Sequence, residues 1–171
     1  MLEAINDFIL QYTDVTQDKL FRGYQNRSAL PQTNDYCMYW VSNAARVGTN
    51  VNEYTDKQKA VIDTLNEYQV SIDFCGDDQE KQEERVLNLA ILGRSYFACN
   101  FFKTHGINFN YAEDVQYLPY VDEAKQFVHR YRIVLHLTRW DKLTLTQQSA
   151  TVVNVDVVNV DVAYPPQERR D

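Results

Sequence analysis

The chain has 171 residues and a hydrophobic fraction of 44%, a globular composition that fits one domain or a domain with an arm. Its formal net charge is −7, which argues against a dedicated DNA-binding module because such modules carry a basic face. The apolar runs are too short for a membrane span, and the N-terminus lacks the basic region of a secretory signal, so we expect neither.

The first half of the chain alternates between periodic and irregular segments. Residues 2–12 place apolar side chains on one helical face and predict a short amphipathic helix, and residues 21–31 read as irregular chain. Residues 36–41 are apolar at both parities, as in a strand that is covered on both faces, and the pattern continues more weakly to residue 48. Residues 50–56 read as a polar loop.

A long strand followed by a helix is the next predicted unit. Residues 60–75 alternate, with Tyr68 and Val70 on the same face. Gly76 should end this strand. Asp77 should then be the N-cap of a helix over residues 78–97, since Glu80 lies three positions later and apolar residues follow at spacings of three and four.

Two more extended segments follow this helix. Residues 115–121 predict a short strand or extended piece that Pro119 interrupts. Residues 126–140 show the longest regular alternation in the chain, with Ile133 on the apolar face and Arg132 on the opposite face. Residues 143–146 then lead into the last strand candidate.

The last strand candidate is a duplication, in which Val153–Val157 and Val158–Val162 carry the same five residues. Because five is odd, the valines of the two copies point to opposite faces of an unbroken strand. Either a bulge near Val157 resets the phase, or the strand changes the face that it buries. Pro165 and Pro166 end the pattern, because proline cannot donate a ladder hydrogen bond.

These elements predict an α+β fold with two layers, a mainly antiparallel sheet with helices packed on one face. We expect residues 60–75 to pair with residues 36–47, and residues 126–140 to pair with the region of residues 153–162. The predicted organisation is a single α+β domain over residues 1–163 and a C-terminal extension over residues 164–171.

Catalytic and metal-binding patterns are absent or weak, so we expect a protein that is not an enzyme and has no metal or cofactor. The three histidines are scattered, and the three cysteines are best read as reduced residues packed as small hydrophobes. Cys99 and His105 fit packing at a helix end better than a nucleophile and base, and Gly93 with Ser95 is only a fragment of a nucleophile elbow inside the predicted helix. Asp156 and Asp161 fit solvated strand positions better than paired catalytic carboxylates.

Four short elements follow one another along the chain: residues 23–27 with Pro31, residues 70–76, residues 114–119 with the aromatic strand 131–137, and residues 158–162 with residues 164–166. Taken in this order, they resemble the neck or tail terminator proteins of tailed bacteriophages and prophages. Cys75 stands where an aromatic residue is expected in that family.

The resemblance implies a virion structural protein that forms a ring, usually sixfold, at the head-proximal end of the tail. Such a ring stops tube polymerisation and docks the tail onto the head connector, while genomic DNA passes through its lumen without specific binding. The implied partners are further copies of this chain in a homo-oligomer, tail tube and sheath proteins, and neck proteins, after assembly in the host cytoplasm. The alternatives are a head-closure or tail-completion neck protein and, with less support, a small enzyme or a nucleic-acid-binding module.

The expected interface residues come from three segments of the elements named above. Tyr24 and its neighbours mix polar and aromatic groups in a loop, where contacts are common, although a plain turn would look the same. The chain has 12 tyrosines, a residue type that is enriched at subunit interfaces. The full set is Tyr24, Gln25, Asn26, Arg27, Tyr117, Leu118, Pro119, Tyr164, Pro165 and Pro166.

Deleting residues 164–171 should leave a folded subunit and damage assembly, because this charged tail follows the two prolines that end the last strand candidate. Circular dichroism should be unchanged, while light scattering should report fewer oligomers. Loss of the folded spectrum on deletion would contradict this prediction.

Overall fold

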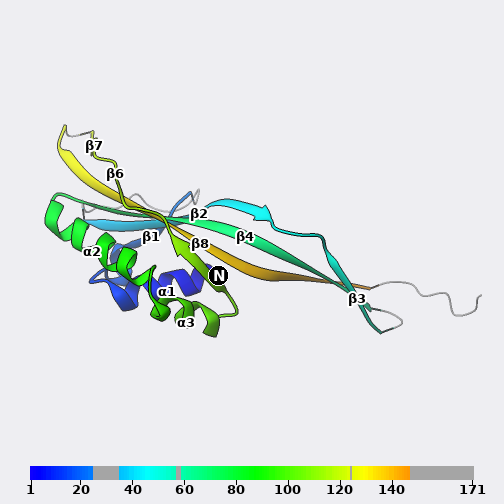
Figure 1. Ribbon diagram of the computed structural model, residues 1–171. Helices are drawn as coiled ribbons and strands as arrows, with labels where there is room; N and C mark the ends of the chain where they lie inside the picture. Colours follow the sequence, from blue (N-terminus) through cyan, green and yellow to red (C-terminus); the bar gives the residue numbers. More distant parts are fainter. Residues whose placement is uncertain (25–34, 57–58, 124, 147–171) are drawn as a thin grey trace, which may run out of the picture.

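The computed structural model describes residues 1–24, 35–56, 59–123 and 125–146, and these form a sheet with helices on one face (Figure 1). The fold is therefore α+β, mainly antiparallel, as the sequence predicts. The elements in chain order are α1 (Leu2–Tyr12), a 3-10 turn (Gln17–Lys19), β1 (Leu20–Arg22), β2 (Tyr36–Arg46), β3 (Val51–Asp56), β4 (Lys59–Gly76), α2 (Gln79–Leu92), α3 (Tyr96–Thr104), β5 (Asn108–Ala112), β6 (Gln116–Tyr117), β7 (Tyr120–Val121) and β8 (Phe127–Thr146).

The strands follow the order β1-β2-β4-β8-β5, and β4 and β8 form the centre of the sheet. β1 runs parallel to β2, and the other pairs are antiparallel. β3 pairs with β4 beyond the end of β2, while β6 and β7 pair with β8 at the opposite end of the molecule. The predicted pairing of residues 60–75 with residues 36–47 is confirmed by the β2–β4 register.

The core lies between the sheet and the three helices. Val70, Ile72 and Phe74 of β4 are fully buried on the face that the sequence predicts to be apolar, beside Ile133 and Leu135 of β8. Each of these large side chains contributes about 1.5–3 kcal/mol by leaving water. The helices cover this face with the buried side chains of Ile5, Phe8, Ile9, Val86, Leu89 and Phe102.

Gly93 ends the first of two helices where the sequence predicts one helix over residues 78–97. A Cβ at Gly93 would lie 2.5 Å from the Cβ of Ala112, so only glycine allows this close approach to β5. The turn over residues 93–95 is therefore not inside a helix. The N-cap is Asp78 rather than the predicted Asp77, and its carboxylate accepts a hydrogen bond from the backbone N–H of Lys81.

Other boundaries differ from the sequence predictions as well. The predicted polar loop over residues 50–56 is wrong, because Val51–Asp56 forms β3. Residues 20–22 form a short edge strand rather than irregular chain, and β5 was not predicted. The strand duplication, its predicted pairing and residues 164–171 lie outside the described residues.

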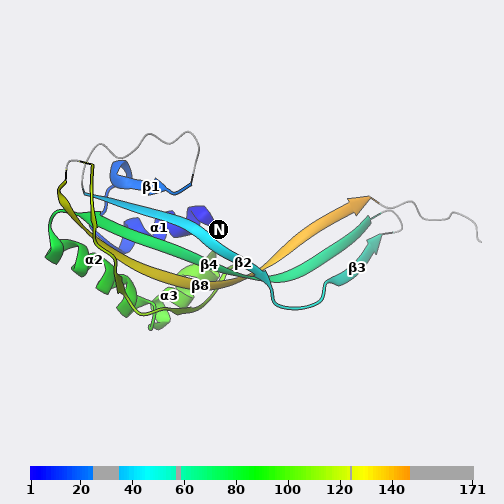
Figure 2. The ribbon, with the colours of Figure 1, turned by 90° about the horizontal axis from the view of Figure 1, so that it is seen from above.

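A long arm projects from the helix-covered body (Figure 2). We define the arm as β3 with residues 59–65 of β4 and residues 139–146 of β8. Its register continues that of the body without a shift, from Gly76 opposite His129 to Lys59 opposite Thr146. Both views show the helices beside the body and none beside the arm, so the arm's exposed apolar side chains lack a helix cover within the described part of the chain (Figures 1 and 2).

Ile133→Asp should unfold the domain, since it places a lone carboxylate at a fully buried position in the centre of the sheet. We expect a loss of more than about 4 kcal/mol in the free energy of unfolding. Thermal melting followed by circular dichroism measures this change. Asn100→Asp on the exposed surface of α3 is the matched control and should melt like the wild type; similar melting of both variants would contradict the assignment of Ile133 to the core.

Candidate interaction surfaces

The histidine and cysteine side chains of the described residues do not gather at one site. In the described part of the chain, no group of three or more His, Cys, Asp or Glu side chains is arranged to hold a metal ion. The thiol of Cys99 points to the carbonyl oxygen of Phe109 at 3.9 Å, and Nδ1 of His105 lies 3.0 Å from the carbonyl oxygen of Phe101. The two side chains therefore each contact a different part of the main chain.

The cysteines differ from one another in burial. Cys37 and Cys75 are buried, as expected for thiols packed as small hydrophobes, but Cys99 is exposed and departs from that expectation. Burial raises the pKa of the Cys75 thiol to about 11, which keeps it protonated and unreactive at neutral pH.

The face of the sheet opposite the helices carries a buried ion pair. Asp73 is fully buried there and accepts hydrogen bonds from Nε and Nη2 of Arg132, at 2.7 and 2.9 Å. The guanidinium of Arg132 lies 4.9 Å from the ring centroid of Trp40, and Tyr24 meets Trp40 edge-on at 5.4 Å. This stack continues from the sheet to the surface, because Tyr24 is 84% exposed.

A second polar cluster on the same face surrounds His136. Its Nδ1 lies 2.9 Å from Glu67, and its Nε2 lies 2.8 Å from Glu113. Burial disfavours the charged imidazole, but the hydrogen bonds to the two carboxylates outweigh burial and raise the pKa of His136. Tyr111 stacks on the imidazole at 4.2 Å, so this cluster binds β4, β8 and the end of β5 together.

Tyr24 opens the loop that was predicted to carry interface contacts, and both ends of that loop are fixed to the body. At its start, the backbone N–H of Gly23 donates to the carbonyl of Tyr39 at 2.9 Å. Tyr24 itself has a φ of 57°, a left-handed conformation that is uncommon for a residue with a side chain. The predicted contacts Gln25, Asn26 and Arg27 lie outside the described residues.

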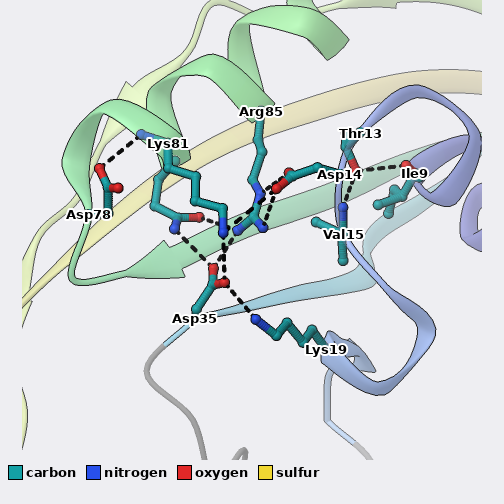
Figure 3. A network of polar contacts seen from close by, with 10 residues as sticks. Ile9, Thr13, Asp14, Val15, Lys19, Asp35, Asp78, Lys81 and Arg85 are labelled. Carbon is teal, nitrogen blue, oxygen red and sulfur yellow. Dashed lines mark hydrogen bonds and ion pairs between the residues drawn. The ribbon is translucent and has the colours of Figure 1, made fainter.

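At the other end of this loop, Asp35 joins a network built around Arg85 of α2 (Figure 3). The Arg85 guanidinium is 3% exposed and donates hydrogen bonds to Asp14 and Asp35. Gln82 and Lys19 donate to Asp35 at 3.1 and 2.9 Å. Burial alone would raise the pKa of Asp35, but the hydrogen bonds from Arg85, Lys19 and Gln82 hold it well below its usual range.

Tyr117, Leu118 and Pro119 lie at the end of the molecule opposite the arm, where β6 and β7 pair with β8 (Figure 1). The Tyr117 hydroxyl lies 2.7 Å from Nδ1 of His129, and its ring lies 4.8 Å from that of Tyr131. Leu118 is half-buried and its backbone N–H donates to the carbonyl of Arg130, whereas Pro119 is exposed. Tyr117 and Leu118 are therefore held against β8, and Pro119 is exposed beside them.

Among the predicted interface residues that the structure describes, Tyr24 and Tyr117 lie on opposite faces of the sheet. Tyr117 is opposite Tyr131 in the register and so lies on the helix side of the sheet, whereas Tyr24 packs on Trp40 on the other side. Phe127 and Val121, at the same end as Tyr117, are 55% and 58% exposed and were not predicted. The remaining predicted residues Tyr164, Pro165 and Pro166 lie outside the described residues.

The arm carries further exposed apolar groups that sequence reasoning missed. Trp140 is 48% exposed and lines a shallow hollow of about 350 Å³ together with Val51 and Asp63. Leu143 and Leu145 are 55% and 42% exposed and point to the other face of the strand. The only available signal was that Trp140 is out of phase with the odd-numbered apolar positions of residues 127–137, to which Leu143 and Leu145 return.

Comparison with known proteins identifies one matching family model, described as phage neck terminator protein, which covers residues 2–167. A search of curated proteins finds no match. Among the helices of the described residues, none is long and apolar enough to cross a membrane.

Arg85→Met should lower the free energy of unfolding by about 3 kcal/mol at pH 7, since it leaves Asp14 and Asp35 without their buried partner. Hydrogen bonding to Arg85 also holds the pKa of Asp14 down. Carboxylates with lowered folded-state pKa values stabilise the fold above their unfolded pKa of about 3.9, and this stabilisation is lost as the pH falls through the folded values. The difference between wild type and variant should therefore shrink below about pH 4.

Urea denaturation at pH 7, 5 and 3 measures this difference directly. Arg94→Met is the matched control, because the Arg94–Asp114 pair is exposed and should contribute less than about 1 kcal/mol. Equal effects of the two substitutions at pH 7 would show that the network around Arg85 does not stabilise the fold.

Proposed function

We propose that this chain, which belongs to the family of phage neck terminator proteins, forms a ring at the head-proximal end of the phage tail. The family places the protein in the neck of the virion as a structural component that contacts other tail and head proteins. The expected number of copies in the proposed ring is six, the usual number that the resemblance to this family implies.

The observation that carries this proposal, beside the family match, is the presence of exposed apolar groups at both ends of an elongated subunit. Phe127 and Val121 lie at one end, and Trp140, Leu143 and Leu145 lie on the arm at the other. Two different surfaces at opposite ends suit a head-to-tail contact between copies, which generates a closed ring when the rotation between neighbours closes. Exposed apolar groups that gather in this way are typical of surfaces that a partner covers.

The ring would act by shape and binding rather than by a reaction. One of its faces would cover the last ring of the tail tube and so stop polymerisation, and the other would bind the head connector. The net charge of −7 supports a lumen through which DNA passes without adhering, because like charges repel. On the open sheet face of the body, the buried side chains of Asp73 and His136 pair with Arg132, Glu67 and Glu113 of the same subunit, so these groups act within the subunit.

Disabling the gene in a phage that carries it tests this proposal. Electron microscopy should show overlong tails and heads without tails, because nothing ends the tube or joins it to the connector. Tails of normal length that remain separate from heads would contradict the terminator role and favour a head-closure or tail-completion protein instead.

Adding purified protein to the defective lysate should restore joined particles. Phe127→Asp should restore at least about tenfold fewer, because a charge replaces an exposed apolar group at the expected contact. Asn100→Asp, which changes the same charge on α3, is the control and should act like the wild type. Equal rescue by Phe127→Asp would remove this end of the molecule from the proposed interface.

A further inference from the structure

One edge of β8 is open along the arm. β5 pairs with β8 only as far as Thr138, whereas β4 pairs with the other edge up to Thr146. Residues 139–146 therefore have no strand neighbour on their outer edge within the described part of the chain. An open edge of this length presents unpaired backbone N–H and C=O groups, which a further strand can satisfy.

The side chains along this edge change face midway. Trp140 and Lys142 point to one face, whereas Leu143 and Leu145 point to the other. The exposed apolar groups therefore move from one face of the arm to the other between Trp140 and Leu143. A strand that matches this edge must change its apolar face at the same place.

The duplicated segment makes this change. In an antiparallel register that sets Val153 opposite Leu145, Val155 falls opposite Leu143. The phase change between Val157 and Val158 then places Val158 opposite Trp140. The polar positions fit this register as well, because Asp156 falls opposite Lys142 and Asn154 opposite Thr144.

We propose that residues 152–159 of one copy add an antiparallel strand to the open β8 edge, residues 139–146, of a neighbouring copy. This inference rests on the proposed function in requiring that copies meet, and it names the contact that would join them. Strand addition of this kind obtains affinity from main-chain hydrogen bonds and specificity from the alternate side chains.

The sequence of the connection favours a neighbouring copy over the chain's own edge. A hairpin in the same register would turn within residues 147–151, which read Gln-Gln-Ser-Ala-Thr. Ser149 is the one residue of this stretch that favours turns, and the stretch lacks the Gly, Asn, Asp and Pro residues that dominate tight hairpins. The proposed contact therefore places the repeat on the edge of another subunit rather than on the chain's own edge.

The second copy of the repeat could occupy the same edge after a shift of five residues. Val158 and Val160 would then lie opposite Leu145 and Leu143, but Ala163 would replace Val158 opposite Trp140. Valine covers more of the exposed Trp140 ring than alanine would, so the proposed register uses the first copy of the repeat.

Disulfide trapping in the full-length protein tests the register. In a Cys99→Ser background, which removes the exposed native thiol, Leu143→Cys with Val155→Cys places the two thiols directly opposite each other. Oxidation should link copies into covalent dimers and larger species on a non-reducing denaturing gel. The control pair Leu143→Cys with Asn154→Cys points to opposite faces and should link at least about tenfold less.

Three results would overturn the inference. Linkage that leaves a monomer of altered mobility would place the strand on its own chain, and preferential linkage of Leu143→Cys with Val160→Cys would assign the second copy of the repeat to the edge. Equal linkage of the matched and control pairs, or none, would exclude the strand. Negative-stain imaging of the same samples separates the two proposals, because rings without the matched linkage would refute this contact and leave the proposed function standing.

Discussion

The antiparallel pairing of β4 with β8 is the constraint on which the rest of the structure depends. The two strands stay in one register over all 18 residues of β4, from the helix-covered body to the end of the arm. Because the register does not shift, each residue is assigned to a face throughout, and a slip of one residue would move every core side chain to the opposite face. The apolar face in the body recruits the helices, and the same two strands carry the arm beyond them.

The opposite face of the body is specified by charges rather than by helices. Asp73 is fully buried without a helix over it, and Arg132 completes its hydrogen bonds from the neighbouring strand. A buried charge that lost its partner would cost several kcal/mol, so a register that separated these residues would be strongly disfavoured. His136 on β8 likewise hydrogen-bonds to Glu67 on β4. Both polar clusters therefore favour the same strand pairing as the apolar core does.

The sequence predicted the long elements because their periodicity is sustained, and it failed where tertiary contact decides. The alternation over residues 60–75 and 126–140 indicated β4 and β8 correctly. The spacing of apolar residues continued past Gly93, so the break between α2 and α3 could not be read without the contact to Ala112. β3 was missed because residues 50–56 are rich in polar side chains, and its pairing with β4 is what makes it a strand.

The candidate surfaces show the same division. Tyr24 and Tyr117 were found because aromatic residues stood in loop or interrupted segments, but the sheet that separates them could not be deduced from either segment. Trp140 was counted only as the end of an alternating strand, since nothing local indicates that the helices stop before it. Whether a side chain is exposed depends on which other elements cover it, whereas the periodicity of a strand shows only which residues lie on the same face.

The arm connects the fold to assembly. A narrow ribbon without a helix cover buries little apolar surface, and an isolated two-stranded ribbon is only marginally stable in water. Here the ribbon is anchored because β4 and β8 continue from the core into the arm in one unbroken register. Its open edge and exposed side chains can then gain from burial at a lower entropic cost than a flexible segment would incur, because the edge strand is already extended. A subunit built in this way presents a preformed surface to its neighbour, and the energy of the contact comes from covering what the helices leave bare.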